Sequence, residues 1–170
     1  ISADEVIRVT PEELSRASFL KTPQQVLALF EQPSYKITPD EIGKTLCLAL
    51  DDIQDPGNLG TIIRLADWFG IEYVFCSPNT VDIYNPKTVQ ATMGGIARVK
   101  VCYTPLKELI TSLPDDIPVY GTFLNGKNIY DQTLSNTGLI VMGNEGKGIS
   151  PEIEELITNK LYIPSYPQDR

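Results

Sequence analysis

Histidine is absent from this 170-residue sequence, and cysteine is scarce. The absence of histidine excludes both the commonest general base and the commonest metal ligand of proteins. Cys47, Cys76 and Cys102 fall in separate predicted strands and show no CxxC spacing. We therefore expect reduced thiols, with neither a disulfide nor a zinc site, and no metal is predicted.

Long hydrophobic runs and an excess of basic charge are also missing. No apolar segment approaches the roughly 20 residues of a membrane span, and no charged-then-apolar leader precedes the predicted elements. We expect a cytoplasmic protein with no membrane partner, and because the chain opens at Ile1 we interpret it as cut or processed. The net charge of −8 argues against a strongly nucleic-acid-binding surface on this piece.

What is present is the composition of an ordinary folded core, with 42% hydrophobic and 21% charged residues. The length predicts one full domain plus a fragment of a second. Residues 1–33 look unlike the rest: Thr10-Pro11-Glu12-Glu13 is a capping box that predicts a helix through Ala17. Residues 22–30 fit either a second helix or a strand. Residues 34–45 have the composition of a linker.

From residue 46 onward, strand and helix patterns alternate. Strands are predicted at 46–50, 71–76, 99–102, 117–120 (closed by Gly121), 139–142 and 161–163. Helices are predicted after the turn at 55–58 and at 86–93, 106–113 and 151–157. This alternation is typical of an α/β domain: a mostly parallel sheet with helices on both faces.

Polar loops follow three of these strands. The first is Asp55-Pro56-Gly57-Asn58, where Asp55 or Asn58 can cap the next helix, with Arg64 off that helix's apolar stripe. The second is the glycine-rich loop at 143–148, and the third spans 163–167. Ligands of open α/β sheets bind at the carboxyl ends of strands, so these loops are the candidate site. Neither of the first two loops has the dinucleotide pattern GxGxxG.

Together these stretches resemble a known family. The segments LDDIQDPGNLGTIIRLADWFG, VMGNEGKGIS and LYIPSYPQDR resemble, in order, the three signatures of the SpoU-type (TrmH-like) RNA 2′-O-ribose methyltransferases of the SPOUT superfamily. The resemblance makes residues 46–170 the catalytic domain and residues 1–33 the end of a small RNA-substrate-binding domain. The third signature normally continues into a Ser-Leu-Asn-rich last helix, which is missing because the chain stops at Arg170.

The resemblance implies a C-terminal trefoil knot, here truncated, and an active site completed in a homodimer. Arg64, Asn58 and Glu145 match the polar catalytic positions. Backbone groups would hold the cofactor S-adenosylmethionine. They belong to Thr122, Phe123 and Leu124, to Met142 and Gly143, and to Ile163. The implied reaction is methyl transfer to a ribose 2′-hydroxyl of rRNA or tRNA.

Structural alternatives exist for these residues. Arg64 could pair with Asp67 or stack on Trp68, Asn58 could be only a helix cap, and Glu145 could be a solvated turn residue. Asp51 and Asp52 are expected to make structural hydrogen bonds and to bind no metal, whereas Trp68 and Phe69 are expected in the core or at a dimer interface. The alternative function is a non-catalytic RNA-binding or assembly protein on the same knotted fold. A Rossmann-type nucleotide-binding enzyme is the weakest of the three.

Overall fold

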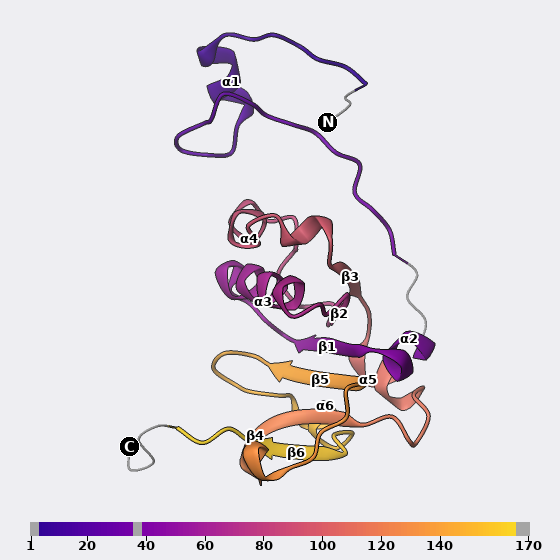
Figure 1. Cartoon of the computed structure of the whole chain (residues 1–170). Helices are drawn as coiled ribbons and strands as arrows, with labels where there is room; N and C mark the ends of the chain where they lie inside the picture. The colour runs from indigo at the N-terminus through magenta and orange to yellow at the C-terminus, as the bar shows by residue number, and fades with distance from the viewer. Residues whose placement is uncertain (1–3, 36–38, 166–170) are drawn as a thin grey trace. The chain divides into compact units, whose positions relative to one another are not determined.

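The computed structural model describes residues 4–35 and 39–165, and the chain divides into two compact units, Ile1–Pro33 and Ser34–Arg170 (Figure 1). In the first unit, the helix predicted from the capping box is confirmed as α1 (Pro11–Ala17). The Thr10 hydroxyl accepts a hydrogen bond from the Glu13 N–H at 3.3 Å, and the Glu13 carboxylate accepts one from the Thr10 N–H at 2.8 Å. Both halves of the capping box are therefore formed.

The prediction of a helix or strand within residues 22–30 is wrong. The structure assigns neither there, and the side chains of Val26, Leu29 and Phe30 are largely exposed. A strand needs a neighbouring strand for its backbone hydrogen bonds, and a short helix needs tertiary packing on its apolar face. The described part of this unit supplies neither, so the apolar run keeps an irregular backbone.

The second unit contains every strand and helix predicted from residue 46 onward, with shifted ends. Its elements in chain order are α2 (Pro39–Lys44), β1 (Leu46–Asp51), α3 (Pro56–Trp68), β2 (Tyr73–Cys76), α4 (Pro86–Ala91), the 3₁₀ turn η1 (Gly95–Ala97), β3 (Lys100–Tyr103), α5 (Leu106–Thr111), β4 (Val119–Asn128), the 3₁₀ turn η2 (Ile129–Asp131), β5 (Gly138–Gly143), α6 (Pro151–Glu154) and β6 (Asn159–Tyr162). The sheet order is β3-β2-β1-β5-β4-β6, with every named pair parallel. The predicted α/β fold is confirmed.

Two apolar clusters cover the sheet. On one side the predicted stripe of α3, formed by Leu59, Ile62, Ile63 and Ala66, is buried against β1 and β2. The other cluster joins alternate residues of β1 and β5 to α5 and α6. Because a strand buried on both faces needs apolar residues throughout, β1 reads LCLAL without polar alternation.

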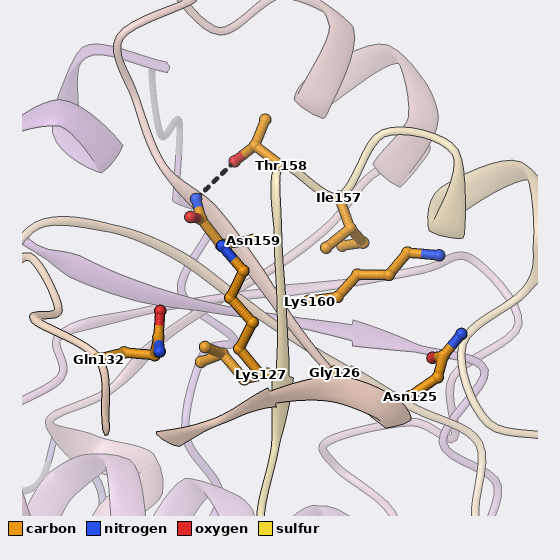
Figure 2. Close-up of a pocket in the computed structure, with 9 residues that line it drawn as sticks. Asn125, Gly126, Lys127, Gln132, Ile157, Thr158, Asn159 and Lys160 are labelled. Atoms are coloured by element: carbon orange, nitrogen blue, oxygen red, sulfur yellow. Dashed lines mark hydrogen bonds between the residues drawn. The ribbon is translucent and has the colours of Figure 1, made fainter. Parts of the chain in front are cut away.

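The sequence predicts that β4 ends at Gly121, but the strand continues to Asn128. Leu161 of β6 is the register partner of both Thr122 and Lys127, so β4 makes a wide bulge and then meets β6 again. Figure 2 shows Gly126 and Lys127 beside the strand that carries Asn159 and Lys160. A Cβ atom at position 126 would lie 2.3 Å from the backbone carbon of Leu161, so only glycine fits there. This close backbone approach lets the chain continue where a turn was predicted.

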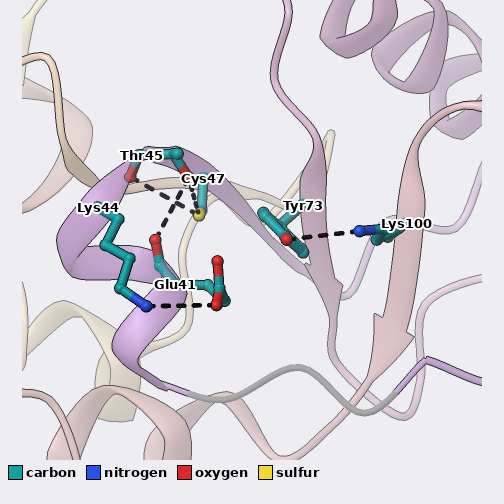
Figure 3. Close-up of polar contacts among 6 residues, drawn as sticks. All are labelled: Glu41, Lys44, Thr45, Cys47, Tyr73 and Lys100. Carbon is teal, nitrogen blue, oxygen red and sulfur yellow. Dashed lines mark hydrogen bonds and ion pairs between the residues drawn. The ribbon is translucent and has the colours of Figure 1, made fainter.

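The expected linker at 34–45 contains the helix α2. Ile42 is fully buried in the core beside β1. This burial explains why the segment forms a helix, although its proline and glycine content is typical of a linker. At its end, the Thr45 hydroxyl donates a hydrogen bond to the Glu41 carbonyl at 3.3 Å (Figure 3). At the amino ends of β2 and β3, Lys100 donates to the Tyr73 hydroxyl at 3.5 Å (Figure 3). These contacts stabilise the amino-terminal end of the strands, which is opposite to the candidate site.

The strand order creates a switch point between β1 and β5. From β1 the chain builds β2 and β3 to one side, and the second half builds β4 and β6 to the other. β1 and β5 lie side by side over the register pairs from Leu46–Gly138 to Asp51–Gly143 (Figure 1). Ligand sites of open parallel sheets form at the carboxyl ends of such strands.

Candidate functional site

The loop after β1 is held in shape by its own side chains. Asp55, rather than Asn58, caps α3: its carboxylate accepts the Asn58 N–H at 2.8 Å. Asp52 adopts a left-handed backbone with φ of 60°, and its N–H donates to the Ser77 hydroxyl at 2.9 Å. Its carboxylate accepts the Gln54 side-chain amide at 2.7 Å. These hydrogen bonds stabilise the conformation of the loop.

The loop after β5 closes on itself. The side-chain oxygen of Asn144 accepts the N–H groups of Gly146 and Lys147 at 2.9 and 3.0 Å, and the backbones of Asn144 and Gly148 bond to each other. A Cβ atom at Gly143 would lie 2.2 Å from the Gly148 backbone, so a side chain is excluded there. The glycines thus permit a tight loop that turns its backbone toward β1.

Glu145 joins the two loops. One carboxylate oxygen accepts the Asn58 side-chain amide at 3.1 Å, and the Gln54 and Asp55 N–H groups lie at 3.4 Å from the carboxylate. The structure therefore brings together two of the three predicted catalytic residues, from signatures 87 positions apart. The alternative of Asn58 as the cap of α3 is wrong. The side chain of Glu145 is exposed, as expected of a turn residue, but its carboxylate accepts these hydrogen bonds.

Two further contacts between the loops were not predicted. Asn144 donates its side-chain amide to the Asp52 carbonyl at 2.7 Å, and the Ser150 N–H donates to the buried Asp51 carboxylate at 2.7 Å. The expectation of structural hydrogen bonds at Asp51 and Asp52 is confirmed. The sequence signal for the missed partners was present, because Asn144 lies in the glycine-rich loop that follows the neighbouring strand and Ser150 comes just after it.

The environment of Glu145 favours its ionised form. Burial alone would raise the pKa of this carboxyl. The hydrogen bonds from its own N–H, the Asn58 amide and the Gln54 and Asp55 N–H groups outweigh burial and hold the pKa below its ordinary value. Glu145 is therefore an acceptor that organises donors, and a poor proton donor at neutral pH.

Arg64 extends from α3 without a partner among the described residues. The alternative of an ion pair between Arg64 and Asp67 is wrong, because both Asp67 carboxylate oxygens accept hydrogen bonds from Arg98 at 2.7 Å, which also lowers the Asp67 pKa. Arg64 lies about 9 Å along the helix axis from Asn58, and no described contact joins its side chain to Asn58 or Glu145. Trp68 is 82% exposed, so a core position for it is wrong.

The residues expected to hold the cofactor lie along the same edge of the sheet. Met142 and Gly143 end β5, Thr122 ends the part of β4 before its bulge, and Ile163 follows β6. Leu124, Met142 and Ile163 are 94%, 37% and 56% exposed. Since β5, β4 and β6 are consecutive in the sheet, this edge presents apolar side chains beside strand-end backbone groups, the mixture that a small-molecule site requires.

Phe123 forms a cation–π contact that was not predicted from the sequence. The ammonium of Lys160 lies 4.7 Å from the centre of the Phe123 ring and forms an ion pair with Glu154. The ring edge also lies 2.9 Å from the Cβ position of Gly121, which leaves no room for a side chain there. Lys160 thereby links α6 and β6 to the bulge of β4.

A separate cavity of about 390 Å³ opens between β6 and the second part of β4. Figure 2 shows Lys127, Gln132 and Asn159 around it. None of the predicted site residues lines it. We place the candidate site at the strand ends, where the loops of both signatures converge.

Metal and thiol chemistry find no support in the described part of the chain. There, no group of three or more histidine, cysteine, aspartate or glutamate side chains is arranged to hold a metal ion. Cys47 and Cys76 are buried free thiols, and Cys102 is a half-buried one. Burial raises the pKa of Cys76 to about 12, so it stays protonated. Within the same residues, no helix has both the length and the apolar character needed to cross a membrane.

The chain is similar to known proteins in both sequence and structure. The chain is 32% identical over 162 residues to the 23S rRNA (guanosine(2553)-2′-O)-methyltransferase RlmP of Bacillus subtilis, covering 94% of this chain and 64% of that protein. It is 35% identical to the mitochondrial rRNA methyltransferase 3 of Mus musculus, over 68% of this chain and 29% of that protein.

Among solved structures, the AdoMet-bound rRNA methyltransferase from Sinorhizobium meliloti superposes with a TM-score of 0.81 at 28% identity, covering 95% of this chain and 63% of that one. The chain thus spans less than two thirds of the length of these relatives. The sequence model of the SpoU rRNA Methylase family matches residues 45–170, the region that contains both signature loops and the whole sheet. The chain therefore belongs to the SpoU rRNA Methylase family.

Proposed function

We propose that this chain carries the catalytic domain of an S-adenosylmethionine-dependent enzyme that methylates a ribose 2′-hydroxyl of ribosomal or transfer RNA. The observation that carries the proposal is the bond between Asn58 and Glu145, which joins both signature loops at the switch point of the sheet. The names of its relatives, among them a 23S rRNA 2′-O-methyltransferase and an rRNA methyltransferase, support the same reaction.

The edge formed by β5, β4 and β6 fits the cofactor. Backbone groups of Thr122, Phe123, Leu124, Met142, Gly143 and Ile163 would hold it, and the exposed side chains of Leu124, Met142 and Ile163 offer apolar surface for an adenine ring. The bound cofactor supplies an activated methyl group on a sulfonium. The task left to the protein is to place the ribose hydroxyl in line and to stabilise the charge that develops on it.

Arg64 is the group proposed for that charge. A guanidinium is never deprotonated in a protein, so Arg64 cannot act as a general base. It can clamp an RNA phosphate by two parallel hydrogen bonds and stabilise oxyanion character at the ribose oxygen. The hydroxyl proton then leaves to the phosphate or to a water molecule. Glu145 and Asn58 hold the loops in position, and neither needs to change its protonation state.

The proposal includes a cytoplasmic homodimer with a trefoil knot at its carboxyl end. The knot is proposed from the match of residues 45–170 to the SpoU rRNA Methylase family. The exposed side chains of Leu65, Trp68 and Phe69 at the end of α3 support a second subunit, because exposed apolar groups so close together mark interaction surfaces. Residues 1–33, a separate unit, are proposed to belong to an RNA-binding domain.

Calorimetric titration with S-adenosylmethionine and S-adenosylhomocysteine tests the proposal, followed by methyl transfer to in vitro transcribed ribosomal RNA. Micromolar cofactor binding and a radiolabelled RNA product are expected. If RNA binds and neither cofactor form does, the enzyme proposal fails and the non-catalytic RNA-binding function takes its place.

A further inference from the structure

The turn between α4 and η1 contains a strained residue two positions before Gly95, and Gly95 packs against the backbone of Arg64. Met93 has a φ of 50° and is followed by Gly94 with a φ of 88°. Among the described residues, Asp52 and Met93 alone combine a side chain with a positive φ, and Asp52 belongs to the candidate site. Left-handed backbone is unfavourable for a long side chain and persists where the surroundings enforce it, often at functional sites.

The surroundings that enforce this turn are on α3. Gly60 meets α4 so closely that a Cβ atom would lie 2.5 Å from the Ala91 side chain. The Cβ position of Gly95 lies 3.6 Å from the Arg64 Cα, and Arg98 binds Asp67 with two hydrogen bonds. The face of α3 that carries Gly60, Arg64 and Asp67 therefore contacts α4, the start of η1 and the residue that follows η1.

The contacts between α3 and the turn leave the side chain of Met93 exposed to solvent. Met93 is 71% exposed, while Thr92 before it is buried and bonds to the Val89 carbonyl at 2.7 Å. Packing of its own side chain therefore does not compensate for the strain at Met93. The arrangement displays a soft, apolar, adaptable side chain on the turn that packs, through Gly95, against the backbone of Arg64, the residue with the proposed RNA-binding guanidinium.

We propose that Met93 contacts a nucleobase that flanks the methylated ribose. This inference rests on the proposed function, because Arg64 must grip the RNA at that ribose. A nucleotide clamped at Arg64 has its base and its neighbours within reach of adjacent side chains. The face of an unpaired base is apolar and is recognised in single-stranded RNA by flat or polarisable side chains. Met93 is thus a residue for substrate positioning, separate from the cofactor.

Two variants of Met93 separate this role from folding. Asn tolerates left-handed backbone but lacks the apolar surface, so Met93→Asn should fold at least as stably as wild type. Leu keeps the apolar bulk, so Met93→Leu should retain RNA recognition. We expect Met93→Asn to lower kcat/KM for in vitro transcribed ribosomal RNA about tenfold, equivalent to about 1.4 kcal/mol, with an unchanged cofactor Kd by calorimetry.

The outcomes are distinguishable. Loss of RNA kcat/KM in Met93→Asn, with recovery in Met93→Leu and the same sedimentation as wild type, supports the inference. Unchanged RNA kinetics in Met93→Asn overturns it while leaving the proposed function intact. A shift of Met93→Asn to a smaller species in sedimentation also overturns it, since Met93 would then contact a second copy of the chain. A wild-type chain that binds neither cofactor nor RNA overturns the proposed function, and this inference with it.

Discussion

Asn58 and Glu145 bond to each other at 3.1 Å across the seam between β1 and β5, although 87 positions separate them in the chain. Each belongs to a different loop, and each loop is otherwise stabilised by its own hydrogen bonds. This contact, with the Asn144 bond to the Asp52 carbonyl, ties the two loops into one site.

A double-mutant cycle at this contact should show coupling. Asn58→Ala and Glu145→Gln are each expected to lower the free energy of unfolding by about 1 kcal/mol, the usual net value of a hydrogen bond. The double variant should lose less than the sum, because both changes weaken the same bond: Asn58→Ala removes its donor and Glu145→Gln removes the charge of its acceptor. Chemical denaturation of the four proteins measures this, and strict additivity would show that the bond contributes nothing in solution.

The contribution of Glu145 to stability should depend on pH. Its pKa in the folded state is below the ordinary 4.5, so its stabilising effect is complete above pH 4.5 and is lost as the pH falls through the folded-state pKa. The difference in unfolding free energy between wild type and Glu145→Gln should therefore be constant well above pH 4.5 and shrink as the pH falls below 4.5. A difference that grows on acidification would contradict the hydrogen-bonded carboxylate.

Replacement of Arg64 should damage chemistry and spare the fold. Because no described residue pairs with it, Arg64→Ala should change the melting temperature little. Loss of one charge-stabilising donor typically lowers kcat by about a hundredfold or more, and we expect that loss with an unchanged cofactor Kd. Arg64→Lys should recover only part of the activity, since an ammonium cannot bind a phosphate through two parallel bonds. Lys107→Ala, which removes an exposed cation on α5, is the control and should keep full activity.

Gly126 should not tolerate even a methyl group. A Cβ atom there would lie 2.3 to 2.8 Å from backbone atoms of Leu161 and Tyr162, which cannot move without opening β6. We expect Gly126→Ala to cost about 3 kcal/mol of unfolding free energy. Gly146→Ala is the matched control, because the nearest atom to its Cβ position is at 3.7 Å and the change should cost about 0.5 kcal/mol or less. Equal stability of the two variants would contradict the close contact with β6.

Lys160 should act on the cofactor through Phe123. Removing its charge in Lys160→Met breaks the cation–π contact and the Glu154 ion pair that hold the bulge of β4. A contact of this strength predicts a rise in cofactor Kd of about threefold to fivefold, with kcat at saturating cofactor unchanged. Lys160→Arg should restore affinity because it keeps the cation. An equal fall of kcat in both variants would point to general damage instead.

Local patterns were sufficient for much of this fold. The capping box at Thr10 and the stripe of α3 are determined by neighbouring residues, and the structure has both. The prediction that Asn58 and Glu145 belong together came from two signatures, and the parallel order of β1 and β5 explains why they meet.

Features that depend on distant partners were missed. The extension of β4 past Gly121 depends on the bulge and on contact of Gly126 with β6, which no window around residue 121 reveals. An ion pair of Asp67 with Arg64 in its own helix was one alternative, but Arg98 binds both Asp67 carboxylate oxygens instead. For residues 22–30, a suitable local sequence lacked the neighbour that a helix or strand requires.

The strand order also has a consequence for synthesis of the chain. β1 can pair with β2 soon after both leave the ribosome, but its other edge waits for β5, which begins at Gly138. At ordinary translation rates that interval is on the order of ten seconds, during which the apolar segment LCLAL keeps one edge open to other chains. A nascent chain stopped before Gly138 would need the protection of a chaperone, and it would have no assembled site because Glu145 would not yet exist.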